Sequence, residues 1–289
     1  MSSPRALPPA IRSLPALTIV VVLVGASLRA PIVAVAPVAR EIGGDLAVGA
    51  AVVGLLTSIP VLCFAVFAPL AIGIVRRGGA DFALTVALGG ALVGCIVRST
   101  GGVAVALVGT AIMGAFIAIG NVVIPIIIAR EYSAHRAHTM TGVYTSALNV
   151  GTMTVTVATA PLSSAIGWRW AILSWAVFGL AALVVWIPLR GLRAALAPSP
   201  GPRSRAAEGS TAVLRHGPTW LLAGAFAGQA FAFYAMTAWL PTLLADQGFS
   251  GAAAGAISAI FQVAGIAGSL LLPVVTLRAS LRVAAIAAG

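Results

Sequence analysis

Long apolar runs separated by short polar stretches dominate the chain from residue 15 onward. A helix that crosses the hydrocarbon core of a bilayer needs about 20 mostly apolar residues. We break the runs at charged residues and at clusters of glycine and proline. This predicts eight spanning helices, over residues 15–39, 51–75, 82–98, 103–128, 139–165, 168–190, 218–244 and 251–276. A ninth apolar run begins near Arg282. The pattern therefore predicts an all-α polytopic membrane protein.

One connection is longer and more polar than the others. Residues 191–217 are rich in proline, serine and arginine, which is typical of a flexible linker between two helical bundles. The sequence thus divides into four parts. They are a cytoplasmic tail at 1–14, a six-helix N-terminal bundle at 15–190, a cytoplasmic linker at 191–217, and an incomplete C-terminal bundle of two to three helices at 218–289.

Composition excludes several classes of protein. Of the 289 residues, 60% are hydrophobic and 8% are charged, and the mean hydropathy is +1.08. An average soluble domain is about 25% charged, so an ordinary soluble enzyme and a disordered chain are excluded. The net charge of +11 comes without any compact run of basic and aromatic residues, so we expect no nucleic-acid partner.

All 17 basic residues are arginines, and their positions predict an orientation. With the N-terminus in the cytoplasm, thirteen of them lie in inside regions and one, Arg29, lies within a span. Only Arg40, Arg98 and Arg169 lie in outside regions. This distribution follows the positive-inside rule. We therefore expect a multi-pass protein of the cytoplasmic membrane with a cytoplasmic N-terminus.

Arg29 is the most informative polar residue, because it lies near the middle of the first span. A central arginine costs about 2.5–3.5 kcal/mol on insertion scales, so it usually faces a bundle interior or an aqueous cavity. Its fixed charge and five donors suit a carboxylate or a small inorganic anion. The alternative is a strut that bonds to backbone carbonyls of neighbouring helices.

Four further residues are weaker candidates for the substrate pathway: Asn121, Tyr144, Gln229 and Tyr234. For each of them, helix packing is the competing interpretation. All six acidic residues and all three histidines lie in loops or at span ends. The spans therefore contain no evident proton carrier and no carboxylate partner for Arg29.

No catalytic, nucleotide-binding or metal-binding motif is present, so we predict no enzyme activity and no cofactor. Cys63 and Cys95 both fall in apolar segments and are expected to be packing residues.

Several segments together resemble one family. They are LRAPIVAVAPVAREIGGDL, GLLTSIPVLCFAVFAPLA, GNVVIP, MTGVYTSAL, GWRWAILSWA and FYAMTAWLPTLLADQGFS. This combination is similar to the cyanate and 2-nitroimidazole transporter branch of the major facilitator superfamily. One departure concerns the loop after the second span, where Arg76 and Arg77 are present but the family's preceding Asp is missing.

The resemblance implies twelve helices in two bundles, with a small-molecule substrate bound between them. It implies alternating-access transport of a small anionic or polar solute, such as cyanate or a related compound, by a monomer in the lipid bilayer. Because this chain covers one bundle and about a third of the second, we expect it to be truncated. The alternatives are a non-functional fragment of such a transporter and a membrane-embedded enzyme.

Overall fold

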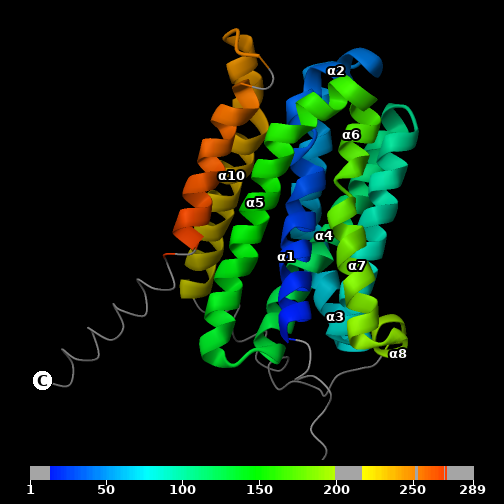
Figure 1. The fold of residues 1–289 in the computed structure, drawn as a ribbon, viewed down its shortest axis with the longest axis vertical. Coiled ribbons are helices and arrows are strands. Elements are labelled where there is room, and N and C mark those ends of the chain that lie inside the picture. Colours follow the sequence, from blue (N-terminus) through cyan, green and yellow to red (C-terminus); the bar gives the residue numbers. More distant parts are fainter. Residues whose placement is uncertain (1–13, 199–216, 251–252, 270, 272–289) are drawn as a thin grey trace, which may run out of the picture.

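The computed structural model describes residues 14–198, 217–250, 253–269 and 271. These residues form α-helices and one short 3-10 helix, and no strand occurs among them. The helices run nearly parallel and form one upright bundle (Figure 1). They are α1 (Leu14–Val33), η2 (Ala36–Val38), α2 (Ala39–Asp45), α3 (Ala50–Thr100), α4 (Val103–Glu131), α5 (Ala134–Ile166), α6 (Trp168–Ser174), α7 (Val177–Arg190), α8 (Leu192–Leu196), α10 (Gly217–Asp246) and the helix Ala253–Ser269.

The first span is broken near its far end. Pro37 has no backbone N–H and therefore cannot donate to the carbonyl of Val33, the last residue of α1. The chain continues through a 3-10 turn into α2, and the whole span is Leu14–Asp45. Arg29 lies at the middle of this span, as the sequence predicts.

The second and third spans form one continuous helix, α3, of 51 residues. The helix bends at Gly79, whose φ is 81° and ψ is 162°. Residues other than glycine rarely adopt this backbone conformation. The bend lies between the predicted spans 51–75 and 82–98, so both spans are found without the expected loop.

The second half of α3 packs closely on α4 through glycines. A Cβ atom on Gly94 would lie 2.3 Å from the backbone nitrogen of Met113, and one on Gly109 would lie 2.2 Å from that of Arg98. Small residues of this kind let membrane helices approach closely.

α5 lies between α1 and the C-terminal helices (Figure 1). On one side, Gly151 of α5 would meet Ala26 of α1 if it carried a Cβ atom. On the other side, Ser146 hydrogen-bonds Ser269 over 2.8 Å. α5 begins five residues before the predicted span, and it takes His135 and His138 into its first turns rather than leaving them in a loop.

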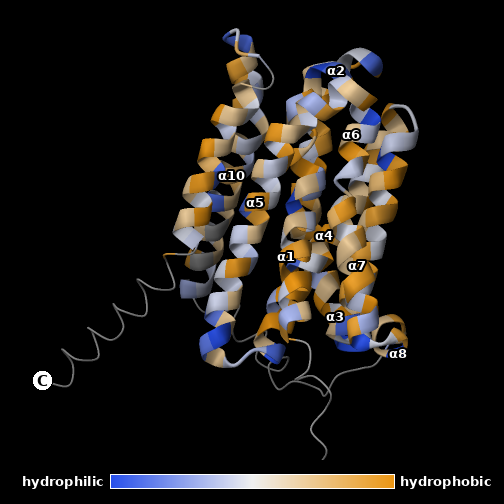
Figure 2. Ribbon diagram, in the orientation of Figure 1, coloured by the Kyte–Doolittle hydropathy of each residue, from blue (hydrophilic) through white to orange (hydrophobic). Residues whose placement is uncertain are grey.

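Apolar residues fill the middle of the bundle and polar residues gather at its two ends (Figure 2). Among the described residues, five helical segments are long and apolar enough to cross a membrane, and α3 is one of them although it contains two predicted spans. α5 is not among the five, because hydroxyl side chains lower its hydropathy. We call the two ends of the bundle the α2 end and the α8 end, after the short helices that lie there (Figure 1).

Of the predicted linker 191–217, the structure describes residues 191–198, where Leu192–Leu196 form α8, and Gly217, which begins α10. Residues 199–216 lie outside the described part of the chain, as do the end of the eighth predicted span and the ninth apolar run near Arg282.

Candidate functional site

The Arg29 side chain lies where α1, α5 and α10 meet. It is half-buried, and its Nη1 atom donates a hydrogen bond to Oδ1 of Asn149 over 3.2 Å. Its guanidinium carbon lies 4.2 Å from the centre of the Phe233 ring and 5.9 Å from that of Tyr234. Within the described residues, no carboxylate pairs with it.

Aromatic rings continue this site into two more helices. The rings of Phe233 and Tyr234 lie 5.4 Å apart, edge to face. Phe64 of α3 lies 6.2 Å from Tyr234, and Phe261 of the helix Ala253–Ser269 lies 5.8 Å from Phe233. The rings shield one side of the guanidinium from water and stabilise its charge through their π faces, yet they do not neutralise it. We call Arg29, Asn149, Phe233 and Tyr234 the Arg29 site.

Asn149 is held firmly in this site. Its side chain is buried, and a Cβ atom added to Gly265 would lie 2.9 Å from its Nδ2 atom. The helix Ala253–Ser269 therefore closes over the amide from the side opposite α1. The sequence singles out Asn149 with Tyr144 among the polar residues of its span, but neither Asn149 nor Phe233 is one of the five predicted pathway residues.

Tyr144 and Asn121 form a separate pair next to the site. The Tyr144 hydroxyl donates to Oδ1 of Asn121 over 3.4 Å and so joins α5 to α4. Tyr144 also lies against Gly25, one helical turn before Arg29 on α1. The pair therefore neighbours the Arg29 site without a hydrogen bond to Arg29 in the described structure.

Gln229 lies one turn before Phe233 on α10, and it is exposed. Of the five predicted pathway residues, Arg29 and Tyr234 come together in one site. Tyr144 and Asn121 bond to each other, and Gln229 stands apart. A pathway role for these five residues remains a prediction.

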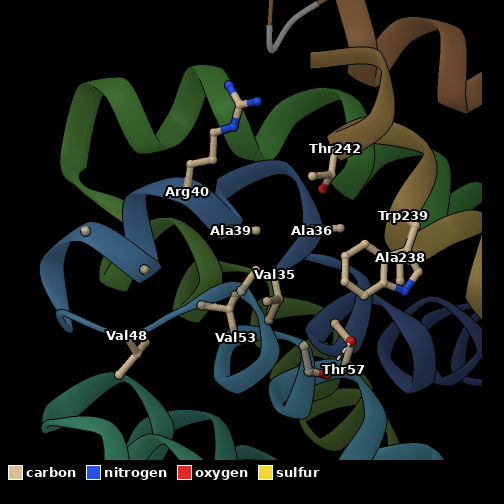
Figure 3. A pocket seen from close by; sticks show the side chains of 14 residues that line it. Val35, Ala36, Ala39, Arg40, Val48, Val53, Thr57, Ala238, Trp239 and Thr242 are labelled. Carbon is tan, nitrogen blue, oxygen red and sulfur yellow. Dashed lines mark hydrogen bonds between the residues drawn. The ribbon is translucent and has the colours of Figure 1, made fainter. Parts of the chain in front are cut away.

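A cavity of about 440 Å³ lies toward the α2 end, with η2, α2 and the first turns of α3 on one side and α10 on the other. Arg40 lies at its rim, and Trp239 and Thr242 of α10 face it from the other side (Figure 3). The rest of its wall is apolar apart from Thr57. Arg40 also forms an ion pair with Asp246, the last residue of α10, and so joins the two halves of the chain above the cavity.

The sequence predicts Arg98 as the last residue of the span 82–98 and counts it with the outside regions, but it does not predict that the side chain is buried. α3 continues two residues beyond Arg98, and the side chain is fully buried. Its Nη1 atom donates to the carbonyl of Pro31 over 2.6 Å. Arg169, by contrast, lies near the bundle surface, where it pairs with Asp45 and caps the carbonyl of Gly101. The three arginines predicted in outside regions are Arg40, Arg98 and Arg169. Each of them therefore has a structural partner.

Four charged residues form a network at the α8 end. Arg190 of α7 pairs with Glu131 over 2.5 Å and with Asp81 over 3.3 Å. Arg130 pairs with the same two carboxylates. Asp81 follows Arg77 by four residues, after the Gly79 bend, and it ties α3 to α4 and α7. The carboxylates of this network pair with Arg130 and Arg190, and no described ion pair joins them to Arg76 or Arg77.

Comparison with known proteins identifies relatives over most of the chain. A model of the Major Facilitator Superfamily matches residues 17–289. An uncharacterized transporter of Bacillus subtilis (strain 168) is 32% identical over 262 residues, which is 88% of this chain and 62% of that protein. A 2-nitroimidazole transporter of Escherichia coli (strain K12) is 30% identical over 256 residues, which is 88% of this chain and 63% of that protein. The chain thus spans a little over three fifths of the length of these relatives.

Solved structures give the same fold. A bacterial homolog of the human lysosomal transporter Spinster, in an inward-facing and unoccupied conformation, superposes with a TM-score of 0.64 at 18% identity. The match covers 89% of this chain and 60% of that one. A peptide transporter of the POT family bound to alafosfalin gives a TM-score of 0.55 at 16% identity, over 75% of this chain and 46% of that one. At these identities the likeness concerns the fold alone.

Proposed function

The chain belongs to the major facilitator superfamily, and on this premise we propose that it carries a small anionic or polar solute across the cytoplasmic membrane. Cyanate and 2-nitroimidazole are the first candidates. The 2-nitroimidazole transporter among the relatives supports the second, and the resemblance of the sequence motifs supports both. The proposal concerns the whole protein, of which this chain supplies the Arg29 site.

One observation carries the proposal: an arginine at the middle of a membrane span whose charge no described carboxylate neutralises. Arg29 uses Nη1 for Asn149, one face for Phe233 and a hydrogen bond for Tyr234, and its five N–H groups leave further donors beyond these. Those donors suit two adjacent acceptor atoms, as in a nitro group or a carboxylate. Both the aromatic rings and the guanidinium are flat, which favours a small planar solute.

The location of the site fits alternating access. Arg29 belongs to the N-terminal bundle and its ring partner Phe233 to the first helix after the linker. A solute bound between them would be exposed to one side or the other as the two parts rock. We further propose that the α8 end is cytoplasmic, since α8, Arg76 and Arg77 lie there and the positive-inside rule favours that side.

The test measures uptake of radiolabelled cyanate and 2-nitroimidazole into proteoliposomes that contain the protein expressed from its complete gene. We expect saturable uptake of at least one of them. Arg29→Ala should abolish it, and Arg29→Lys should restore little, because a lysine keeps the charge but loses the planar fork. Arg193→Ala, on the exposed helix α8, is the matched control and should transport normally.

Asn149→Asp distinguishes a ligand site from a strut. This change keeps the shape of the side chain but places a carboxylate beside Arg29. If Arg29 binds substrate, the new carboxylate competes for its charge and uptake of an anion falls, while thermal stability holds or rises. If Arg29 is only a strut, the stronger pair leaves transport intact. Normal transport by both Arg29→Ala and Asn149→Asp would refute the proposal.

A further inference from the structure

Arg98 is a fully buried cation that the proposed function does not yet use. It lies near the end of α3, next to Gly109 of α4, whose lack of a side chain lets the two backbones meet. Only its Nη1 atom has a hydrogen-bond partner, and its Nε and Nη2 atoms have none within the part of the chain that the structure describes. A buried charge with so few partners stabilises a fold poorly. A contribution to stability alone therefore does not account for a buried arginine at position 98.

The one partner of Arg98 is the carbonyl of Pro31, which lies in the last turn of α1. Carbonyls in the last turn of a helix have no intrahelical partner, and they carry the negative end of the helix dipole. Here the helix stops because Pro37 cannot continue it, so the free carbonyls lie inside the bundle rather than in water. Arg98 supplies both a donor and a positive charge at this broken end.

Arg98 and the Arg29 site hold the same turn of α1 from opposite sides. Residues 29 and 31 are two positions apart, which is about 200° around a helix. Arg29 faces α5 and α10, whereas Pro31 faces α3, beside Leu88 and Cys95. The hydrogen bond from Arg98 therefore fastens the turn that carries Arg29 to the rigid α3–α4 pair.

We propose that Arg98 is a positioning residue for substrate binding. By holding the broken end of α1, it sets the height and rotation of the turn from which Arg29 reaches Asn149 and Phe233. The proposal rests on the function proposed above for Arg29. It explains why a charge is buried here: a neutral apolar residue would pack in its place but would release the end of α1.

The first test separates binding from folding. Arg98→Met keeps the length and apolar stem of the side chain but removes the donor. We expect it to raise the KM for the transported probe, cyanate or 2-nitroimidazole, about tenfold. The maximal rate per folded protein and the amount of protein in the membrane should stay close to wild type. Arg98→Lys should bring KM back to within about threefold of wild type, because Arg98 uses one donor and one charge, both of which lysine has.

The contrast with Arg29 makes the test specific. Lysine should rescue position 98 and fail at position 29, where the planar group is used. Arg98→Lys also keeps the proposal testable if Arg98→Met does not fold. A wild-type KM in Arg98→Met, or a KM in Arg98→Lys as poor as in Arg29→Lys, would overturn the positioning role.

A second readout does not depend on transport. In protein labelled with ¹⁵N-arginine, the Arg29 side-chain signal senses the ring current of Phe233, 4.2 Å away. Arg29→Lys identifies this signal by its loss. Arg98→Met should shift it, and Arg193→Lys, the control on α8, should not. If neither probe is transported but the signal shifts, Arg98 still positions Arg29 and only the proposed function fails. An unmoved signal overturns the inference itself.

Discussion

The ion pair between Arg40 and Asp246 is expected to act as a latch at the α2 end, and this can be tested by a double-mutant cycle. The pair joins the end of the first span to the end of α10, above the cavity of about 440 Å³. Its side chains remain 65% and 59% exposed. Exposed pairs of this kind contribute about 0.2–1 kcal/mol, so the fold should not depend on it.

The same energy has a larger effect on the equilibrium between the open and closed states of the α2 end than on the stability of the fold. If the pair exists only when the α2 end is closed, losing it shifts the ratio of the two states toward open by its full energy. A change of about 0.2–1 kcal/mol corresponds to a factor of about 1.4–5. Arg40→Gln and Asp246→Asn should each produce this shift, and the double variant should produce no more than either one alone.

The assay measures how fast a membrane-impermeant maleimide modifies the thiol introduced by Thr242→Cys, whose side chain faces the cavity (Figure 3). The native Cys63 and Cys95 are buried and provide a low background. Each neutral variant should raise the rate up to about fivefold, and the charge swap Arg40→Asp with Asp246→Arg should restore it. The effect should shrink in high salt, because exposed charges are screened.

Two results would refute the reasoning. If the effects of the two single variants add in the double variant, the residues act independently and form no latch. If neither variant changes the rate, the pair does not bias the conformation. Arg193→Gln, an exposed arginine at the other end of the bundle, controls for the loss of a positive charge.

Two further predictions concern stability. Gly109→Ala places a methyl group 2.2 Å from the backbone nitrogen of Arg98, which cannot move aside, so it should cost about 1–3 kcal/mol and lower the melting temperature in detergent. Gly89→Ala, whose Cβ meets nothing within 4 Å, is the control and should melt at or above the wild-type temperature. Glu131→Gln removes a carboxylate, 14% exposed, from Arg190 and should cost about 1–3 kcal/mol. An unchanged melting temperature would show that Asp81 alone satisfies the network.

The apolar pattern determined the helical architecture of this protein. Spans of about 20 residues are the length that a bilayer demands, and that demand is local, so it can be read along the chain. It predicted the two halves of α3 as separate spans, 51–75 and 82–98, and the helix bends at Gly79, between these two spans. It also placed Arg29 at the middle of a span, because one charge in an apolar run is visible without any neighbour.

The partners of those residues depend on distant parts of the chain. Asn149 reaches Arg29 from 120 residues away, and Arg98 reaches Pro31 from 67 residues away. The side of a helix that faces another helix depends on how all the spans pack together. A hydropathy pattern does not record this, since most sides of these helices are apolar whether they meet lipid or protein.

Arg98 shows the difference most clearly. By sequence it is the last residue of the predicted span 82–98, a position from which an arginine side chain usually reaches the membrane interface. In the tertiary structure α3 continues past it, Gly109 makes room beside it, and the break before Pro37 leaves a carbonyl for it to bind. The sequence alone determined that this chain has membrane-spanning helices and one central charge. Only the packing of these helices decided which charges lie inside, because burial is a property of neighbours that are remote in sequence.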